Sequence, residues 1–198
     1  MGKLVVLAAG LLLLGGGVRS ATVRVECESF ETLGGWTVET QSMRQQGSSY
    51  LMAHGYGVPV SDAETTVKIP AAGRYVVWAR TRDWAAAWRA KGSQAPGRFE
   101  IRIGDWKSGD LGTEGQAWHW VKAGEVELAA GASRVALHDL TGFNGRCDAL
   151  FFASAGEIPS ETPPPSVLVD DPAAYDLIVV GGGVSGCAAA LAASRYNL

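Results

Sequence analysis

The sequence predicts a mainly β protein, built as an antiparallel β-sandwich with jelly-roll topology. The prediction rests on three observations. Short runs between residues 21 and 153 alternate apolar with polar residues, turn-forming residues separate these runs, and no convincing amphipathic helix interrupts them. The chain has 198 residues, 47% apolar and 19% charged, which is enough for one or two packed domains. Its net charge of -3 offers no basic stripe, which argues against a nucleic acid partner.

The first 20 residues have the pattern of a secretory signal peptide. Lys3 gives a positive start, "LVVLAAGLLLLGGG" is an apolar stretch, and small residues Val18 and Ser20 precede Ala21. The alternative is an uncleaved membrane anchor. The apolar stretch is shorter than the roughly 20 residues that span a bilayer, so we favour the signal peptide. We therefore expect a secreted or periplasmic protein.

The segment 21–155 is expected to form the sandwich module. In "TVRVECE", Val23, Val25 and Cys27 point to one face, and charged residues point to the other. The same alternation, bounded by Gly, Pro, Asp and Asn, recurs in six further stretches: "TTVKIP", "GRYVVWAR", "RFEIRIG", "GEVELAAG", "SRVALHDL" and "RCDALFF".

Export would place the three cysteines in an oxidising compartment. Cys27 and Cys147 fall on apolar strand faces, so they form either a disulfide or two buried free thiols, and the spacing leaves both alternatives open. Cys187 is left over.

A second unit begins after a proline-rich linker at 156–174. The segment 175–198 reads as the first strand, glycine turn and first helix of a truncated Rossmann-type domain. In "YDLIVVGGGVSG", Gly181 permits a tight turn, Gly183 lets the backbone approach a pyrophosphate, and Gly186 lets the helix pack on the strand. The full set of expected cofactor-binding residues is Gly181, Gly182, Gly183, Ser185 and Gly186.

The same glycine-rich stretch has another interpretation. "LIVVGGGVSGCAAALAA" contains seventeen uncharged residues, as in a C-terminal membrane anchor. Its shortness and its three successive glycines argue against a spanning helix.

Several phrases resemble one family. "VECESFETLGGWTVETQSM", "GTEGQAWHWV", "LHDLTGFNGRCDALFF" and the long stretch from Tyr50 to Trp84 are similar to the N-terminal domain of secreted bacterial FAD-dependent oxidoreductases. In that family a module similar to carbohydrate-binding, galactose-binding-like jelly rolls precedes the flavin domain. The resemblance implies FAD as the cofactor of a longer parent enzyme, acting on an unknown small-molecule or carbohydrate substrate. The chain ends before the second strand and the ribose-binding acid, so we expect a fragment that is inactive alone and does not hold FAD tightly.

The resemblance to sugar-binding jelly rolls also implies a calcium site. Its ligands would be Glu26 and Glu28 in the first strand and Asp148 in the last, because carboxylate oxygens suit Ca²⁺. The alternative is a solvated acidic face, or pairing of the glutamates with Arg24 or Arg146.

Four tryptophans are candidate ligand-binding residues: Trp84, Trp88, Trp118 and Trp120. Flat rings beside Arg82, Asp83 and His119 suit stacking on a sugar, whereas core or interface packing is the alternative. No nucleophile lies in a pattern with a base, so no catalytic residue is predicted. Two functions follow. The first is the N-terminal part of an exported flavoenzyme, and the second is a stand-alone secreted or membrane-anchored module that binds glycans or mediates adhesion.

Overall fold

A computed structural model describes residues 21–154, 156–162 and 174–196. The predicted signal peptide, and the part of the predicted linker at 163–173, lie outside these residues. The chain divides into two compact units, one up to Pro164 and one from Pro165 onward. The first unit is a β-sandwich, and the second contains a single described helix.

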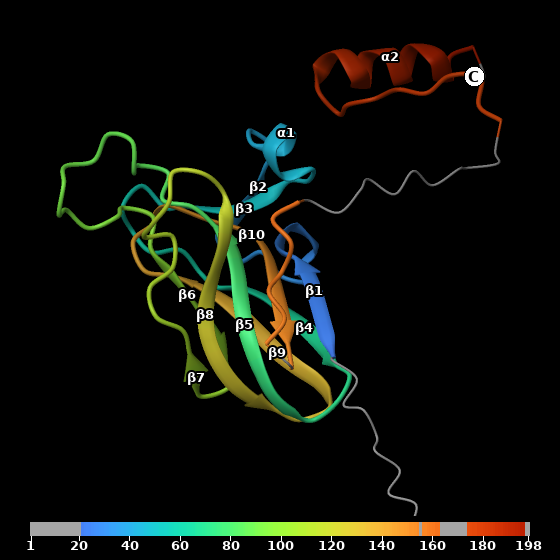
Figure 1. Cartoon of the computed structure of the whole chain (residues 1–198). Coiled ribbons are helices and arrows are strands. Elements are labelled where there is room, and N and C mark those ends of the chain that lie inside the picture. The colour runs from blue at the N-terminus through green and yellow to red at the C-terminus, as the bar shows by residue number, and fades with distance from the viewer. Residues whose placement is uncertain (1–20, 155, 163–173, 197–198) are drawn as a thin grey trace, which may run out of the picture. The chain divides into compact units, whose positions relative to one another are not determined.

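The sandwich consists of two antiparallel sheets (Figure 1). In the six-stranded sheet the order is β2-β3-β10-β5-β8, and β1 also pairs with β10. Its strands are β1 (Thr22–Glu26), β2 (Trp36–Glu39), β3 (Tyr50–His54), β5 (Gly73–Thr81), β8 (His119–Leu128) and β10 (Phe143–Ala153). The four-stranded sheet has the order β4-β9-β6-β7, formed by β4 (Ala63–Ile69), β9 (Gly131–Asp139), β6 (Phe99–Ile103) and β7 (Trp106–Lys107).

One edge of β10 has two partners in succession. Its first half pairs with β3, where Cys147 lies opposite Leu51, and its second half pairs with β1, where Ala149 lies opposite Glu26. On its other edge β10 pairs with β5, with an irregularity between Cys147 and Leu150. Asp148 therefore sits where the partner strand changes, next to the short 3₁₀ helix η1 (Cys27–Ser29).

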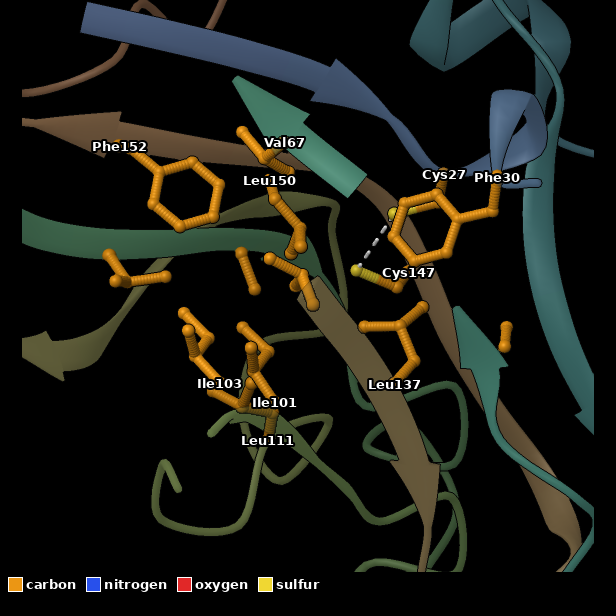
Figure 2. Packing of buried hydrophobic residues seen from close by; sticks show 14 of the residues in the cluster. Cys27, Phe30, Val67, Ile101, Ile103, Leu111, Leu137, Cys147, Leu150 and Phe152 are labelled. Carbon is orange, nitrogen blue, oxygen red and sulfur yellow. Dashed lines mark hydrogen bonds between the residues drawn. The ribbon is translucent and has the colours of Figure 1, made fainter. Parts of the chain in front are cut away.

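The core lies between the two sheets. Alternate residues point inward, as the burial pattern of β4 shows, and they form one continuous apolar cluster. Leu150 and Phe152 from β10 share this cluster with Ile101 from β6 and Leu137 from β9 (Figure 2). Cys27 and Cys147 are also fully buried in it, as free cysteines.

All seven predicted runs lie in strands. The sequence analysis missed β2, β3 and β7. In β3 the first four residues are buried, so no apolar and polar alternation reveals the strand. β7 has only two residues, too few for a periodic signal. A short helix, α1 (Met43–Gln46), separates β2 from β3 and ends at Gly47, whose φ of 82° suits glycine.

The C-terminal unit only partly matches its prediction. The helix α2 (Val184–Ser194) forms where "CAAALAAS" predicts one. The predicted strand before it does not form, because residues 177–180 have no strand partner in the described chain, and an isolated strand has no hydrogen-bond ladder. The structure therefore shows a helix without a Rossmann-type βα start. No described helix is long and apolar enough to cross a membrane.

Candidate functional site

A long loop between β5 and β6 projects from one end of the sandwich (Figure 1). Asp83 organises its first turns from a fully buried position. One carboxylate oxygen accepts a hydrogen bond from the Ala85 backbone N–H at 3.0 Å, and the other pairs with Arg89 Nε at 2.5 Å. The charged partner compensates for burial of the carboxylate, so this part of the loop has a defined conformation.

The loop presents an aromatic cluster. Trp84 stacks on Phe143 with ring centroids 5.9 Å apart, and its indole N–H donates to the Phe143 carbonyl at 3.1 Å. Trp88 contacts Trp84 edge to face at 6.1 Å and is 68% exposed. The Arg146 guanidinium lies over the Trp84 ring at 5.7 Å. The exposed Trp88 ring, held against Trp84, therefore presents an apolar surface at this end of the sandwich.

The neighbouring loops add polar groups to this end. His54 Nδ1 donates to Asn144 Oδ1 at 2.6 Å, and the His54 ring lies 4.5 Å from that of Tyr56, which is 84% exposed. Buried Asp139 ties these loops together by accepting hydrogen bonds from the backbone N–H groups of Val60 and Gly142. Gly142 has a φ of 63° and packs so tightly on Val58 that a side chain would clash. This end of the sandwich is therefore built without much freedom to rearrange.

A cleft of about 420 Å³ lies beside the aromatic cluster, on the outer face of the six-stranded sheet. Because Ala79 points into the core, the next residue, Arg80, points to this outer face. Tyr50 and Met52 of β3 do the same and pack on Trp118, which directly precedes β8. The cleft is lined by Gln45, Arg80, Arg82, Gln116, Ala117 and Trp118.

This outer face contains buried polar atoms without hydrogen-bond partners among the described residues. They are the Tyr50 hydroxyl, Trp118 Nε1, Gln46 Nε2, and the Nε atoms of Arg82 and Arg146. A buried donor without a partner costs about 1–3 kcal/mol, so such groups are usually satisfied by water or a ligand. Other such atoms lie elsewhere: Trp36 Nε1 is in the inter-sheet core, and Arg98 Nε is next to β6 of the other sheet.

The outer face of the six-stranded sheet is rich in positive charge. Among the described residues neither Arg82 nor Arg146 forms an ion pair. Burial lowers the pKa of Arg146 below its usual value, and the charge of Arg82 lowers it further. Both side chains are thus available to donate hydrogen bonds to an oxygen-rich ligand.

Trp120 is covered by the segment 156–162, which returns across the outer face after β10. Its indole N–H donates to the Ser160 carbonyl at 2.9 Å, and its backbone N–H donates to Glu161 Oε1 at 3.1 Å. Glu161 Oε2 also pairs with Arg80 at 3.0 Å. Of the four predicted tryptophans, Trp84 and Trp88 therefore lie in the exposed cluster, Trp118 lines the cleft, and Trp120 is covered.

The three predicted calcium ligands lie near one another. Burial, followed by the negative charges of Glu26 and Glu28, raises the pKa of Asp148 to about 7. Burial and the charge of Glu26 also raise the pKa of Glu28. One buried oxygen of Glu28 has no hydrogen-bond partner among the described residues, and Asp148 Oδ2 has none but lies 3.5 Å from Arg80 Nε, its ion-pair partner.

The third predicted ligand is oriented differently. Glu26 Oε1 forms an ion pair with Arg24 at 2.6 Å, as the alternative interpretation expected. Among the described residues no group of three Asp, Glu, His or Cys side chains is arranged to hold a metal ion. Calcium binding would therefore require Glu26 to leave Arg24.

The glycine motif has the local geometry of a helix-starting turn. Gly181 has a φ of 107°, and Gly186 approaches the Gly181 carbonyl so closely that a side chain would clash. Gly183 caps α2, and the Gly182, Gly183 and Ser185 region is open to solvent. These residues fit a pyrophosphate turn, but the described chain contains no strand beside the helix and α2 buries no residue. FAD binding stays a prediction.

No known family profile and no curated protein sequence matches this chain. Solved structures do match it. The GH26-CBM35 β-(1,4)-mannanase of Podospora anserina covers 70% of this chain with a TM-score of 0.51 and 19% identity. This chain spans 29% of the length of that structure.

Two smaller structures match over nearly their whole length. A family 35 carbohydrate binding module from Clostridium thermocellum has a TM-score of 0.49 and 21% identity, covering 66% of this chain and 96% of its own. The C-terminal CBM6 of LamC, a marine laminarinase from Zobellia galactanivorans, has a TM-score of 0.47 and 18% identity, covering 66% and 98%. At 19% identity the likeness to the mannanase structure shows the fold, an antiparallel sandwich resembling a jelly roll. It lends no support to a flavin-dependent parent.

Sequence reasoning missed most of the cleft. Gln45, Arg80 and Gln116 come from a four-residue helix, from β5 and from the loop before β8, and no local spacing joins them. One signal was present: in "GRYVVWAR", Arg80 occupies a polar position of a strand whose alternate residues are apolar. Its burial on the outer face could not be read from that pattern.

Proposed function

We propose that the sandwich is a carbohydrate-binding module, and that the outer face of the six-stranded sheet receives the glycan together with the aromatic cluster. The observation that carries this proposal is the concentration of buried, unpartnered donors beside exposed aromatic rings. Sugars offer hydroxyl oxygens along their edges and apolar C–H groups on their faces. Donors therefore bind the edges, and aromatic rings stack on the faces.

The hydrogen-bond donors and the aromatic rings of the proposed site lie in two regions. Trp118, Arg82 and Arg146 supply N–H donors in and around the cleft, and Trp84, Trp88 and Phe143 supply ring surface. The similarity to the mannanase from Podospora anserina supports the same function, because the name of that enzyme includes a CBM35 module. Two arginines without ion pairs favour glycans that carry carboxylates over neutral ones.

A glycan array probed with the full chain tests the proposal. We expect binding to a subset of neutral or acidic polysaccharides, and we expect Arg82→Ala to weaken it about tenfold or more, the cost of about one charged hydrogen bond. Arg102→Ala is the matched control on the other sheet, where Arg102 pairs with Glu100, and it should leave binding unchanged. No binding to any glycan, or equal losses in both variants, would contradict the proposed site.

Calcium is a second, separate proposal for the same sandwich. Glu28 would hold the ion through its unpartnered oxygen and Asp148 through Oδ2, which faces Arg80, with Glu26 joining after release from Arg24. The melting temperature of chelator-treated protein should then rise on addition of calcium, and the rise should disappear in Asp148→Asn. An unchanged melting temperature would dispose of the calcium site without affecting the glycan proposal.

The flavoenzyme interpretation rests on the GGGVSG turn and on the family resemblance. If it holds, a longer form of the chain that continues beyond Leu198 should co-purify with flavin absorbance near 450 nm, typical of FAD. The same absorbance with the 198-residue chain is not expected, because the ribose-binding acid and the second strand of the unit are missing. Export of the protein likewise stays a prediction, because it rests on residues 1–20.

A further inference from the structure

Cys27 and Cys147 lie side by side in the sandwich core, although 120 positions separate them in the chain. Cys27 is the first residue after β1, and Cys147 lies in β10, the partner strand of β1. Their sulfur atoms are 3.5 Å apart, and the side chains point toward one another (Figure 2). Both residues are fully buried.

The surroundings of the two thiols are apolar on most sides. Phe30 and Leu137 belong to the same cluster, and the Cys147 thiol has one further contact, to the Ala149 carbonyl at 3.9 Å. Burial raises the pKa of Cys27 well above its usual value, and the proximity of Cys147 adds to the effect. In the folded protein Cys27 is therefore a neutral thiol, and burial keeps external reagents from both sulfurs, so the pair reacts only before the sandwich has closed.

We propose that Cys27 and Cys147 form a structural disulfide when the chain folds under oxidising conditions. A disulfide needs an S–S distance of about 2.05 Å, so the sulfurs must approach by about 1.5 Å from their separation as thiols. The proposal does not depend on glycan binding.

The oxidant is a second disulfide, carried by a small thiol compound or by a thiol-disulfide exchange protein. One cysteine thiolate attacks this disulfide, forms a mixed disulfide and releases one thiol. The other cysteine then attacks the protein sulfur of the mixed disulfide and releases the second thiol. Two thiols of the chain are oxidised, and one disulfide of the oxidant is reduced to two thiols.

The bond would join the beginning and the end of the sandwich. It would fix η1 against β10 and so hold Glu28, next to Cys27, beside Asp148, next to Cys147. The closed loop is long, and a cross-link of this kind stabilises a protein chiefly by restricting the unfolded chain. Melting of the oxidised protein should therefore occur about 10 °C or more above that of the reduced protein.

Cys187 is exposed, so it would also react with the alkylating reagent and add to the number of free thiols counted. The test therefore uses the full chain with Cys187→Ser, which retains only the buried pair. The protein is unfolded, reduced and refolded in a mixture of reduced and oxidised glutathione. It is then denatured with excess iodoacetamide and weighed by mass spectrometry. We expect no alkylated cysteine and a mass 2 Da below that of the reduced chain.

Two outcomes would overturn the proposal: alkylation of both cysteines, or attachment of glutathione to either one. A melting measurement gives an independent readout. Dithiothreitol should lower the melting temperature of the Cys187→Ser protein and leave that of a variant also carrying Cys27→Ala and Cys147→Ala unchanged. Equal responses of the two proteins to dithiothreitol would also contradict the bond.

Discussion

The two outer faces of the sandwich differ in the burial and in the pairing of their charged residues. On the four-stranded sheet, Arg134 pairs with Glu64 at the surface, and the buried carboxylate of Glu100 pairs with both Arg102 and Lys107. On the six-stranded sheet, Arg80 and Asp148 are buried, and several donors around them have no partner. Buried donors without a hydrogen-bond partner among the described residues are more numerous around the second face, and Arg98 Nε, next to β6, is one near the first.

This difference has an energetic meaning. Exposed ion pairs contribute about 0–1 kcal/mol, so the pair of Arg134 with Glu64 on the four-stranded face can form and break at little cost. A buried polar group without a hydrogen-bond partner lowers the free energy of unfolding. Several such groups on one face therefore reduce the stability of that part of the protein. The proposed binding function accounts for these buried polar groups, because a bound ligand would supply their hydrogen-bond partners.

Replacing a buried arginine tests the comparison most severely. Arg80→Ala removes a side chain that is 5% exposed and contacts Gln46, Asp148 and Glu161. We expect a loss of about 3–5 kcal/mol in the free energy of unfolding at pH 8, because two carboxylates lose their cationic partner. Urea denaturation measures it. The control is Arg134→Ala on the other face, where the side chain is 68% exposed and the loss should stay within about 1 kcal/mol. Equal losses would erase the distinction between the faces.

The pH dependence of stability tests Asp148. Its pKa in the folded protein is about 7, above the ordinary value of 3.8. The folded state therefore retains a proton that the unfolded chain loses. This contribution to stability is fully present below about pH 4 and disappears as the pH rises through 7.

The change should be on the order of 3 kcal/mol in the presence of chelator, and Asp148→Asn should abolish it. Denaturant unfolding at pH 4, 5.5, 7 and 8 gives the profile for both proteins. If the wild type and the variant show the same slope, Asp148 is not the titrating group.

Arg82 separates binding from stability. Because its buried Nε has no partner, Arg82→Ala should reduce glycan affinity about tenfold while changing the free energy of unfolding by less than about 1 kcal/mol. Calorimetric titration and urea denaturation measure the two effects on the same preparation. A large loss of stability with unchanged affinity would make Arg82 a structural residue.

Trp88 should give the smallest effect. It lies at the outer edge of the aromatic cluster, so Trp88→Ala removes part of a stacking surface, and we expect affinity to fall about threefold. Stability should change by less than about 0.5 kcal/mol, since the ring is mostly exposed. Unchanged affinity in this variant would confine the site to the cleft.

The sequence was sufficient for the sandwich because strand alternation is local. "TTVKIP" and "SRVALHDL" show their inward residues directly, and both became neighbouring strands. It was insufficient for β3, whose residues are buried on both faces, and for the cleft, whose residues meet only after the sheet has formed.

The tryptophans illustrate the same limit. Trp84 and Trp88 lie in a long loop between strands, where exposed aromatic residues signal a surface role, and this part of the prediction matches their positions. Trp120 lies instead in a strand, β8, and the segment 156–162 covers it. The contact between Trp120 and Ser160 joins residues about 40 positions apart, so no local sequence pattern predicts it.

The indole N–H signals of the tryptophans provide the most direct test of the binding face. Trp118 Nε1 and Trp36 Nε1 are both buried without a partner, but Trp118 faces the cleft and Trp36 packs in the inter-sheet core. In a ¹H–¹⁵N NMR titration with a glycan selected from the array, the Trp118, Trp84 and Trp88 signals should shift, and the Trp36 signal should not. Saturable binding that leaves the Trp118 and Trp84 signals in place would contradict the account.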